Sequence, residues 1–228
     1  MNLSKRLTAI VNIVEKSECI RDVGCDHGYV SIALAEKGYA SKIIASDINR
    51  GPLLRAKDNI TKSGFDGIIE TRLAGGLDDT KDSEIYDSII IAGMGGKLMR
   101  DILNAHPDVL NKARQLVLQP QSEIFLVRRF LRENGFAIRK EDCVCEDGKT
   151  YFIIDAIKGA TLTGDEKMQN LYDKWSEYLI RTSNADLKAF LIRRIETNNQ
   201  YIGGMDSDKS SDLVRENNEM KEVLALMR

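Results

Sequence analysis

The chain has few cysteines, histidines and prolines, and these shortages exclude several kinds of site. Its four cysteines are Cys19, Cys25, Cys143 and Cys145. They lack the paired C-x-x-C spacing of a zinc site, so we expect reduced thiols and no bound metal. The two histidines are His27 and His106, and no Ser/His/Asp set accompanies them. His106 precedes Pro107 and is expected to lie in an inert surface turn.

Neither sign of charge is in excess, and no long apolar run is present. Lys and Arg number 33 against 35 Asp and Glu, which gives a formal net charge of −2. This balance neither indicates nor excludes RNA, because a whole-chain sum hides local basic faces. No window approaches the roughly 18 apolar residues of a membrane span, and the N-terminus has no apolar signal segment. We therefore expect a cytoplasmic protein that makes no membrane contact.

Apolar strand-like and amphipathic helix-like segments alternate through the first 135 residues, which predicts an α/β fold with a parallel sheet. An amphipathic helix at the N-terminus is followed by expected strands at 20–24, 42–47, 68–73, 86–92 and 115–119, and by helices at 30–37, 52–63, 97–104 and 124–134. The β-rich runs 136–144 and 151–157 flank Asp147-Gly148, a strong hairpin signal. Five parallel strands plus a terminal antiparallel hairpin are the Rossmann-like plan of class I methyltransferases, whereas a dinucleotide dehydrogenase needs six parallel strands.

The remaining residues predict a helical appendage. Apolar residues recur at spacings of three and four over 187–202 and again over 213–227, with a polar break at 203–212. Two such helices can fold back as an antiparallel coiled-coil hairpin. We therefore expect a methyltransferase-type domain over 1–158 and a helical coiled-coil domain over 159–228. Self-association and substrate binding through its charged face are both compatible with this appendage.

Segment 22–29, DVGCDHGY, is the most informative stretch, because it links an expected strand to an expected helix. Its glycines allow positive φ or close approach to a ligand, and the helix start presents free N–H groups. The G-x-G-x-x-G pattern that cradles a pyrophosphate is absent, and Asp26 would repel phosphates. A cationic cofactor without phosphate, such as S-adenosylmethionine, fits better. The cofactor candidates in this loop are Asp22, Gly24, Cys25, Asp26, His27 and Gly28.

The ends of the next strands supply further candidates. Asp47 is expected to bind the cofactor ribose, although it could instead cap the following helix. Segment 74–77 lies where adenine would bind, or forms a plain turn. Segment 91–96, IAGMGG, ends the fourth strand, and three glycines there indicate close approach of a planar base. The cofactor candidates from these segments are Asp47, Ile48, Gly75, Gly76, Leu77, Gly93 and Met94.

With these motifs the chain resembles the bacterial tRNA (adenine-22-N1)-methyltransferase family over essentially its whole length. The resemblance is carried by residues 3–7, 22–29, the strand ending at Asp47, 62–64, 76–77, 91–96, 118–120, 146–149 and Tyr151. It implies a class I methyltransferase domain with a C-terminal coiled coil, S-adenosylmethionine as donor and N1 of adenine 22 in tRNA as acceptor.

The chain departs from the family pattern at two places. Segment 74–77 reads Ala-Gly-Gly-Leu where the family commonly has Gly-Asp-Gly-Leu, so residue 75 has no side chain to recognise adenine. Gln121 stands where an asparagine often follows Gln-Pro, and glutamine reaches farther than asparagine.

Transfer to a neutral adenine nitrogen requires orientation and stabilisation of the positive charge that develops, without a strict need for a general base. Asp26 is a candidate for that stabilisation, or alternatively a loop acid that accepts backbone N–H bonds. Gly95 and Gln119 complete the catalytic candidates, since the Gln119 amide can hold a base edge.

Basic residues near the N-terminus, on the expected helix 124–134 and on the helical appendage are candidates for contact with RNA phosphates, although charged runs on helices are usually solvated faces. They are Lys5, Arg6, Arg128, Arg129, Arg132, Arg193 and Arg194. Two other functions remain compatible with the residues. The protein could be a class I methyltransferase for another RNA site or a small molecule, or a non-catalytic RNA-binding or scaffold protein.

Overall fold

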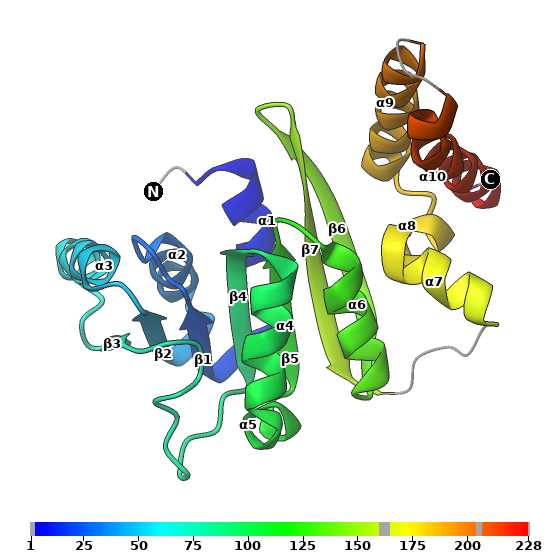
Figure 1. Ribbon diagram of the computed structural model, residues 1–228. Helices are drawn as coiled ribbons and strands as arrows, with labels where there is room; N and C mark the ends of the chain where they lie inside the picture. Colours follow the sequence, from blue (N-terminus) through cyan, green and yellow to red (C-terminus); the bar gives the residue numbers. More distant parts are fainter. Residues whose placement is uncertain (1–2, 160–164, 204–206, 228) are drawn as a thin grey trace. The chain divides into compact units, whose positions relative to one another are not determined.

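Seven strands form a sheet in the order β3-β2-β1-β4-β5-β7-β6 (Figure 1). In chain order they are β1 Ser17–Val23, β2 Ala40–Asp47, β3 Ile69–Leu73, β4 Ser88–Met94, β5 Gln115–Pro120, β6 Phe136–Glu146 and β7 Lys149–Lys158. Strands β1 to β5 pair in parallel, and β7 runs antiparallel to both β5 and β6. The predicted plan of five parallel strands and a terminal hairpin is confirmed.

The structure is a computed structural model that describes residues 3–159, 165–203 and 207–227, without the side chains of 207–209. The chain divides into two compact units, Met1–Thr161 and Leu162–Arg228, which are described separately. Along the described ranges, none of the helices is long and apolar enough to cross a membrane.

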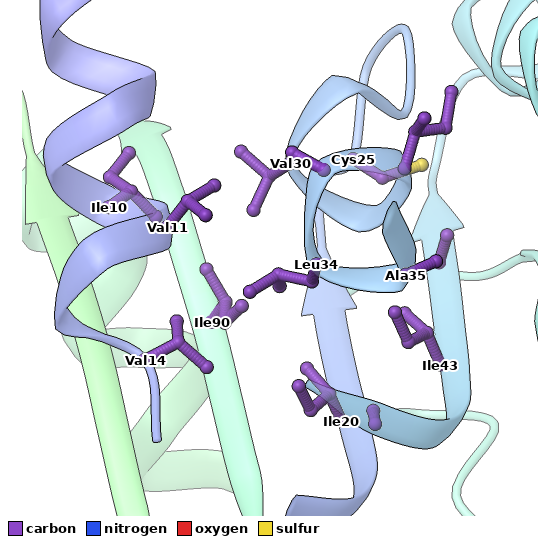
Figure 2. Packing of buried hydrophobic residues seen from close by; sticks show 14 of the residues in the cluster. Ile10, Val11, Val14, Ile20, Cys25, Val30, Leu34, Ala35, Ile43 and Ile90 are labelled. Carbon is purple, nitrogen blue, oxygen red and sulfur yellow. The ribbon is translucent and has the colours of Figure 1, made fainter. Parts of the chain in front are cut away.

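Six helices of the first unit cover the two faces of the sheet. They are α1 Lys5–Ile13, α2 Tyr29–Glu36, α3 Arg50–Ser63, α4 Gly96–Ala105, α5 Pro107–Lys112 and α6 Ile124–Glu133. Helices α1 to α3 pack into one apolar cluster, where Figure 2 shows Val11 of α1 and Leu34 of α2 beside Ile90 of β4. Helices α4 to α6 pack into a second cluster with Ile91 and Leu118. Because helices cover both faces, residues 89–91 of β4 and 116–118 of β5 form continuous buried apolar runs.

The second unit is helical, with α7 Glu166–Trp175, α8 Glu177–Arg181, α9 Ala185–Ile202 and α10 Ser207–Leu226. The pattern at 187–202 predicted α9, but α7 and α8 were not expected. Residues 207–212 belong to α10, so the expected polar break over this range was wrong, and 204–206 lie outside the described residues.

Helices α9 and α10 contact one another through a polar pair as well as apolar side chains. Asn198 is buried and donates through Nδ2 to Oδ1 of the buried Asn217, at 3.0 Å. Buried asparagines of this kind can select one register between paired helices. The helical appendage is therefore present, while its description as a coiled coil stays a prediction.

Candidate functional site

A cavity of about 720 Å³ opens at the carboxyl ends of β1, β2 and β4. It lies at the point where the strand order reverses direction, between β1 and β4. Ligand crevices form there because the loops that follow the two strands leave toward opposite faces of the sheet. The cavity is lined by residues from the loops after β1 to β5 and from α1, α2 and α4.

The loop after β1 forms one wall of this cavity. Gly24 has φ +71° and lines the cavity, and Gly24 and Cys25 both donate their N–H groups to the carbonyl of Ser46, at 2.8 and 2.9 Å. The positive φ favours glycine at residue 24. Gly28 does not line the cavity: a Cβ there would lie 3.3 Å from Cβ of Ala56, so its small size serves packing on α3.

Asp47 joins the β1 loop to the end of β2. Its Oδ1 accepts the Asn49 N–H at 2.7 Å, and its Oδ2 accepts the Asp26 N–H at 3.3 Å. The N-cap position of α3 is Asn49, which makes no side-chain cap hydrogen bond, so Asp47 lies two residues before the cap position and the alternative of Asp47 as the helix cap is not supported. A carboxylate offers about four acceptor positions, and Asp47 therefore retains capacity for ligand hydroxyls.

Asp22 adds a buried carboxyl to the same wall. It is 3% exposed and accepts a hydrogen bond from Ser31 Oγ at 2.6 Å. Burial raises its pKa from an ordinary 3.8 to about 6, while the Ser31 hydrogen bond opposes that rise. With Asp26 and Asp47 also on the lining, this end of the cavity favours a cation.

Replacing Asp22 by asparagine is expected to change how stability depends on pH. A carboxyl whose pKa is raised on folding contributes stability that is complete below pH 3.8 and lost as pH rises through about 6. The loss is about 3 kcal/mol, since one pKa unit corresponds to about 1.4 kcal/mol. Asp22→Asn keeps an acceptor for Ser31 without this loss, so the variant should gain about 3 kcal/mol relative to the wild type between pH 4 and 7.

Urea unfolding at several pH values measures this difference. The matched control is Asp58→Asn, which removes an exposed carboxylate from α3. The control should leave the pH profile close to that of the wild type. If the free energy of unfolding depends on pH in the same way for Asp22→Asn and the wild type, the pKa of the Asp22 carboxyl is not raised on folding.

Gly93, at the end of β4, faces the cavity. It has φ +80°, and the position of its absent Cβ lies 3.8 Å from Gln121 Nε2 and 3.9 Å from Arg6 Nη1. Polar groups from α1 and from the loop after β5 therefore approach the same open backbone. Arg6, Gly93 and Gln121 all line the cavity.

The other two glycines of this segment serve packing. A Cβ on Gly96 would lie 2.5 Å from the carbonyl oxygens of Ser122 and Glu123, and one on Gly95 would lie 3.1 Å from Ser122 Oγ. Gly95 caps α4 and does not line the cavity, so its proposed catalytic contact has no support in this geometry. Among the three glycines only Gly93 lines the cavity, so close approach of a ligand stays a prediction for Gly93.

Two further candidates lie behind the cavity wall. Leu77 is buried in the apolar cluster beneath α4, so its proposed cofactor contact is wrong. Gln119 is fully buried, and its Oε1 accepts a hydrogen bond from Arg6 Nη1 at 3.0 Å. The Arg6 guanidinium also lies 5.5 Å from the centre of the Tyr151 ring. Gln119 therefore does not line the cavity itself but positions Arg6, which does.

The structure separates the basic candidates for RNA contact. Arg128 is 2% exposed, and its Nε donates to both carboxylate oxygens of Glu141 at 3.1 and 3.2 Å, so its assignment to RNA phosphate is wrong. On the same helix, Arg129 lies over the Phe125 ring. The remaining basic candidates are Lys5 and Arg6 on α1, Arg132 on α6, and Arg193 and Arg194 on α9.

Asp78 and His106 line the cavity but were not among the predicted site residues. His106 Nε2 lies 2.9 Å from Asp78 Oδ1, and the histidine lies in a turn as expected while also lining the cavity. His106 joins α4 to the short helix α5, which the sequence pattern did not predict. Their sequence spacing carries no recognisable motif, and only the turn between these helices brings the two side chains together.

The cofactor and catalytic candidates thus fall into two groups. Those that line the cavity are Asp22, Gly24, Cys25, Asp26, His27, Asp47, Ile48, Gly75, Gly76, Gly93 and Met94. Those placed outside its lining are Gly28, Leu77, Gly95 and Gln119. The sequence did not identify Asp78 and His106.

A family model described as a methyltransferase domain matches residues 3–154. The chain is 36% identical to the tRNA (adenine(22)-N(1))-methyltransferase of Bacillus subtilis over 70% of its own length and 66% of that protein. It is 32% identical to a putative tRNA methyltransferase of Mycoplasma pneumoniae over 84% of its own length and 92% of the relative.

The fold is also similar to a solved structure from Streptococcus pneumoniae, a putative tRNA (m1A22) methyltransferase in complex with S-adenosyl-L-methionine. The two share 28% sequence identity and a TM-score of 0.87, and the match covers 98% of this chain and 100% of the other.

Proposed function

Because this chain belongs to the bacterial tRNA (adenine-22-N1)-methyltransferase family, we propose that it transfers a methyl group from S-adenosylmethionine to N1 of adenine 22 in tRNA. The observation that carries this proposal is the convergence of three carboxylates and an open glycine backbone on one cavity at the switch point of the sheet. The matched B. subtilis enzyme supports the acceptor, and the S. pneumoniae complex supports the cofactor.

The residues of the cavity fit this cofactor in size and charge. A volume of about 720 Å³ lies within the usual range for a small-molecule site. Asp22, Asp26 and Asp47 suit a cationic ligand and would repel a pyrophosphate. When bound, S-adenosylmethionine supplies a methyl group activated by a cationic sulfur.

Different residues of the cavity would bind different parts of the cofactor. Asp47 would accept hydrogen bonds from the ribose hydroxyls through its remaining acceptor positions. The free N–H groups at the start of α2 would bind the carboxylate of the amino-acid end. The buried Asp22 would favour the positive charge at that end.

The acceptor base would lie on the side of the cavity formed by Arg6, Gly93 and Gln121. Gln119 and Tyr151 hold the Arg6 guanidinium in place, and Gly93 leaves room for a planar ring. Asp26 lines the same cavity, where its carboxylate would stabilise the positive charge that develops on the methylated base. Orientation and electrostatics are therefore the main contributions of the protein, and no proton need be removed before attack.

Adenine N1 lies on the Watson–Crick edge, so the base must leave its stack or pair at a cost of about a few kcal/mol. Basic residues beside the cavity would offset part of this cost by contacting phosphates. Lys5 and Arg6 are placed for this at the start of α1, and Arg129 and Arg132 lie on α6. We propose that Arg193 and Arg194 on α9 contribute further contacts.

The test of this function is a methylation assay with purified protein, methyl-labelled S-adenosylmethionine and unmodified tRNA. Nucleoside mass spectrometry should find 1-methyladenine, and primer extension should stop at position 22. Cofactor binding without any transfer to tRNA would contradict the tRNA substrate and favour a different acceptor. Absence of cofactor binding would favour a non-catalytic RNA-binding or scaffold protein.

Arg6→Ala is expected to lower kcat/KM for tRNA by about 10- to 100-fold, because it removes a charged hydrogen-bond donor beside the acceptor side of the cavity. The dissociation constant of S-adenosylhomocysteine should stay close to that of the wild type, which separates acceptor binding from cofactor binding. Arg114→Ala is the matched control, since Arg114 precedes β5 and is highly exposed. Equal losses in the two variants would contradict a specific role for Arg6.

A further inference from the structure

One end of the cavity has apolar side chains that the fold leaves uncovered. Ile48, after β2, is 71% exposed, and Leu98 of α4 is 55% exposed. Both line the cavity, together with Ile102 and Ala105 of α4. Such walls suit the two faces of a planar base. Ile48 directly follows Asp47, the residue proposed to bind the ribose, so the adenine of the cofactor would bind between these apolar side chains.

The edge of that base would face the turn after β3. The turn is closed by a hydrogen bond from the Asp78 N–H to the Gly75 carbonyl, at 3.1 Å. It folds Asp78 back over Gly75: a Cβ on residue 75 would lie 3.2 Å from Asp78 Oδ2 and 3.4 Å from Ile48 Cδ1. The Asp78 carboxylate therefore occupies space beside the cavity that a side chain at residue 75 would otherwise enter.

The two carboxylate oxygens of Asp78 have different surroundings. Oδ1 lies 2.9 Å from His106 Nε2, at the far end of α4. Oδ2 is the atom that approaches Gly75. One oxygen thus contacts an imidazole, while the other lies beside Gly75, next to the position that Ile48 also approaches. Asp78 and His106 both line the cavity.

We propose that Asp78, positioned by His106, recognises the 6-amino group of the cofactor's adenine. This inference rests on the proposed function, since it requires an adenosyl cofactor in the cavity. A carboxylate only accepts hydrogen bonds and the adenine 6-amino group donates them, so the two are complementary. A purine that lacks the amino group cannot donate to the Asp78 carboxylate and should bind more weakly. A 6-oxo purine should also bind more weakly, because its carbonyl oxygen and the carboxylate are both hydrogen-bond acceptors.

The test is calorimetric binding of S-adenosylhomocysteine and of its analogue that lacks the 6-amino group, without tRNA. The wild type should prefer the amino form by at least about tenfold, and Asp78→Ala should lose that preference by weakening the amino form alone. Asp82→Ala removes an exposed carboxylate from the same loop and is the matched control. Its preference should equal that of the wild type.

A rescue variant separates recognition from folding. A side chain at residue 75 would point toward the Asp78 carboxylate, so Gly75→Asp combined with Asp78→Ala should restore much of the preference for the amino form. An unchanged preference in Asp78→Ala, or an equal loss for both ligands, would overturn the proposal but not the proposed function, provided that the wild type binds the cofactor. A wild-type protein that binds neither S-adenosylmethionine nor S-adenosylhomocysteine would instead overturn the proposed function, and this inference with it.

Discussion

Arg128→Met is expected to lower the free energy of unfolding of the first unit by about 3–5 kcal/mol, because it leaves a buried carboxylate without its partner. The guanidinium joins α6 to Glu141 of β6, and its carbon lies 5.4 Å from the centre of the Phe152 ring of β7. Both charged side chains are almost completely buried. Urea unfolding of the purified variant measures the loss.

The double variant Arg128→Met/Glu141→Leu distinguishes an unpaired charge from lost packing. Removing both charges together should recover most of the stability, since apolar residues can replace a buried ion pair at little cost. Arg114→Met provides an exposed arginine as control and should change stability by less than about 0.5 kcal/mol. Folded Arg128→Met protein should bind tRNA as the wild type does. Weakened tRNA binding at unchanged stability would instead place Arg128 at the RNA.

Asp47→Ala is expected to weaken binding of S-adenosylhomocysteine by about 10²- to 10⁴-fold. Two hydrogen bonds from ribose hydroxyls to a carboxylate each contribute about 1.5–3 kcal/mol, and the substitution removes both. It also releases the Asp26 N–H from Asp47 Oδ2, which loosens the β1 loop against β2. Calorimetric titration in the absence of tRNA measures the change.

Two further variants make this result specific to Asp47. Asp47→Asn retains one acceptor oxygen and should bind with an affinity between those of the wild type and the alanine variant. Asp58→Ala removes an exposed carboxylate from the neighbouring helix α3 and should bind as the wild type does. Equal affinity of Asp47→Ala and the wild type, with both proteins folded by thermal unfolding, would remove Asp47 from the site.

The local sequence pattern was sufficient to predict the strands of the sheet. Ile89, Ile90 and Ile91 form a buried apolar run whose length fits a strand covered on both faces. Asp147 and Gly148 both adopt positive φ, as a tight hairpin turn requires, and they join β6 to β7 as expected. Asp47 was identifiable because an acid at the end of a parallel strand lies near the crevice whatever the remainder of the fold.

The short helices could not be predicted from the local sequence pattern, because a few residues do not show a helical periodicity. Helix α8 spans only Glu177–Arg181, and Ser176, with φ +70°, separates it from α7. Its first turn is held by Ser176 Oγ, which accepts the Leu179 N–H at 3.2 Å. Buried Leu179 and Ile180 then fix it by packing. Tertiary packing of this kind stabilises helices that are too short to form in isolation.

The sequence by itself determined the strands, their plan of five parallel strands and a hairpin, and the acids Asp22 and Asp47 near strand ends, because each follows from periodicity and from turn residues. Only the tertiary structure decided which polar side chains are partners. Arg6 and Gln119 are 113 residues apart, His106 and Asp78 are 28 apart, and Arg128 and Glu141 are 13 apart. An exposed basic face and a buried ion pair look alike in one chain, since burial and pairing arise only when distant elements pack together.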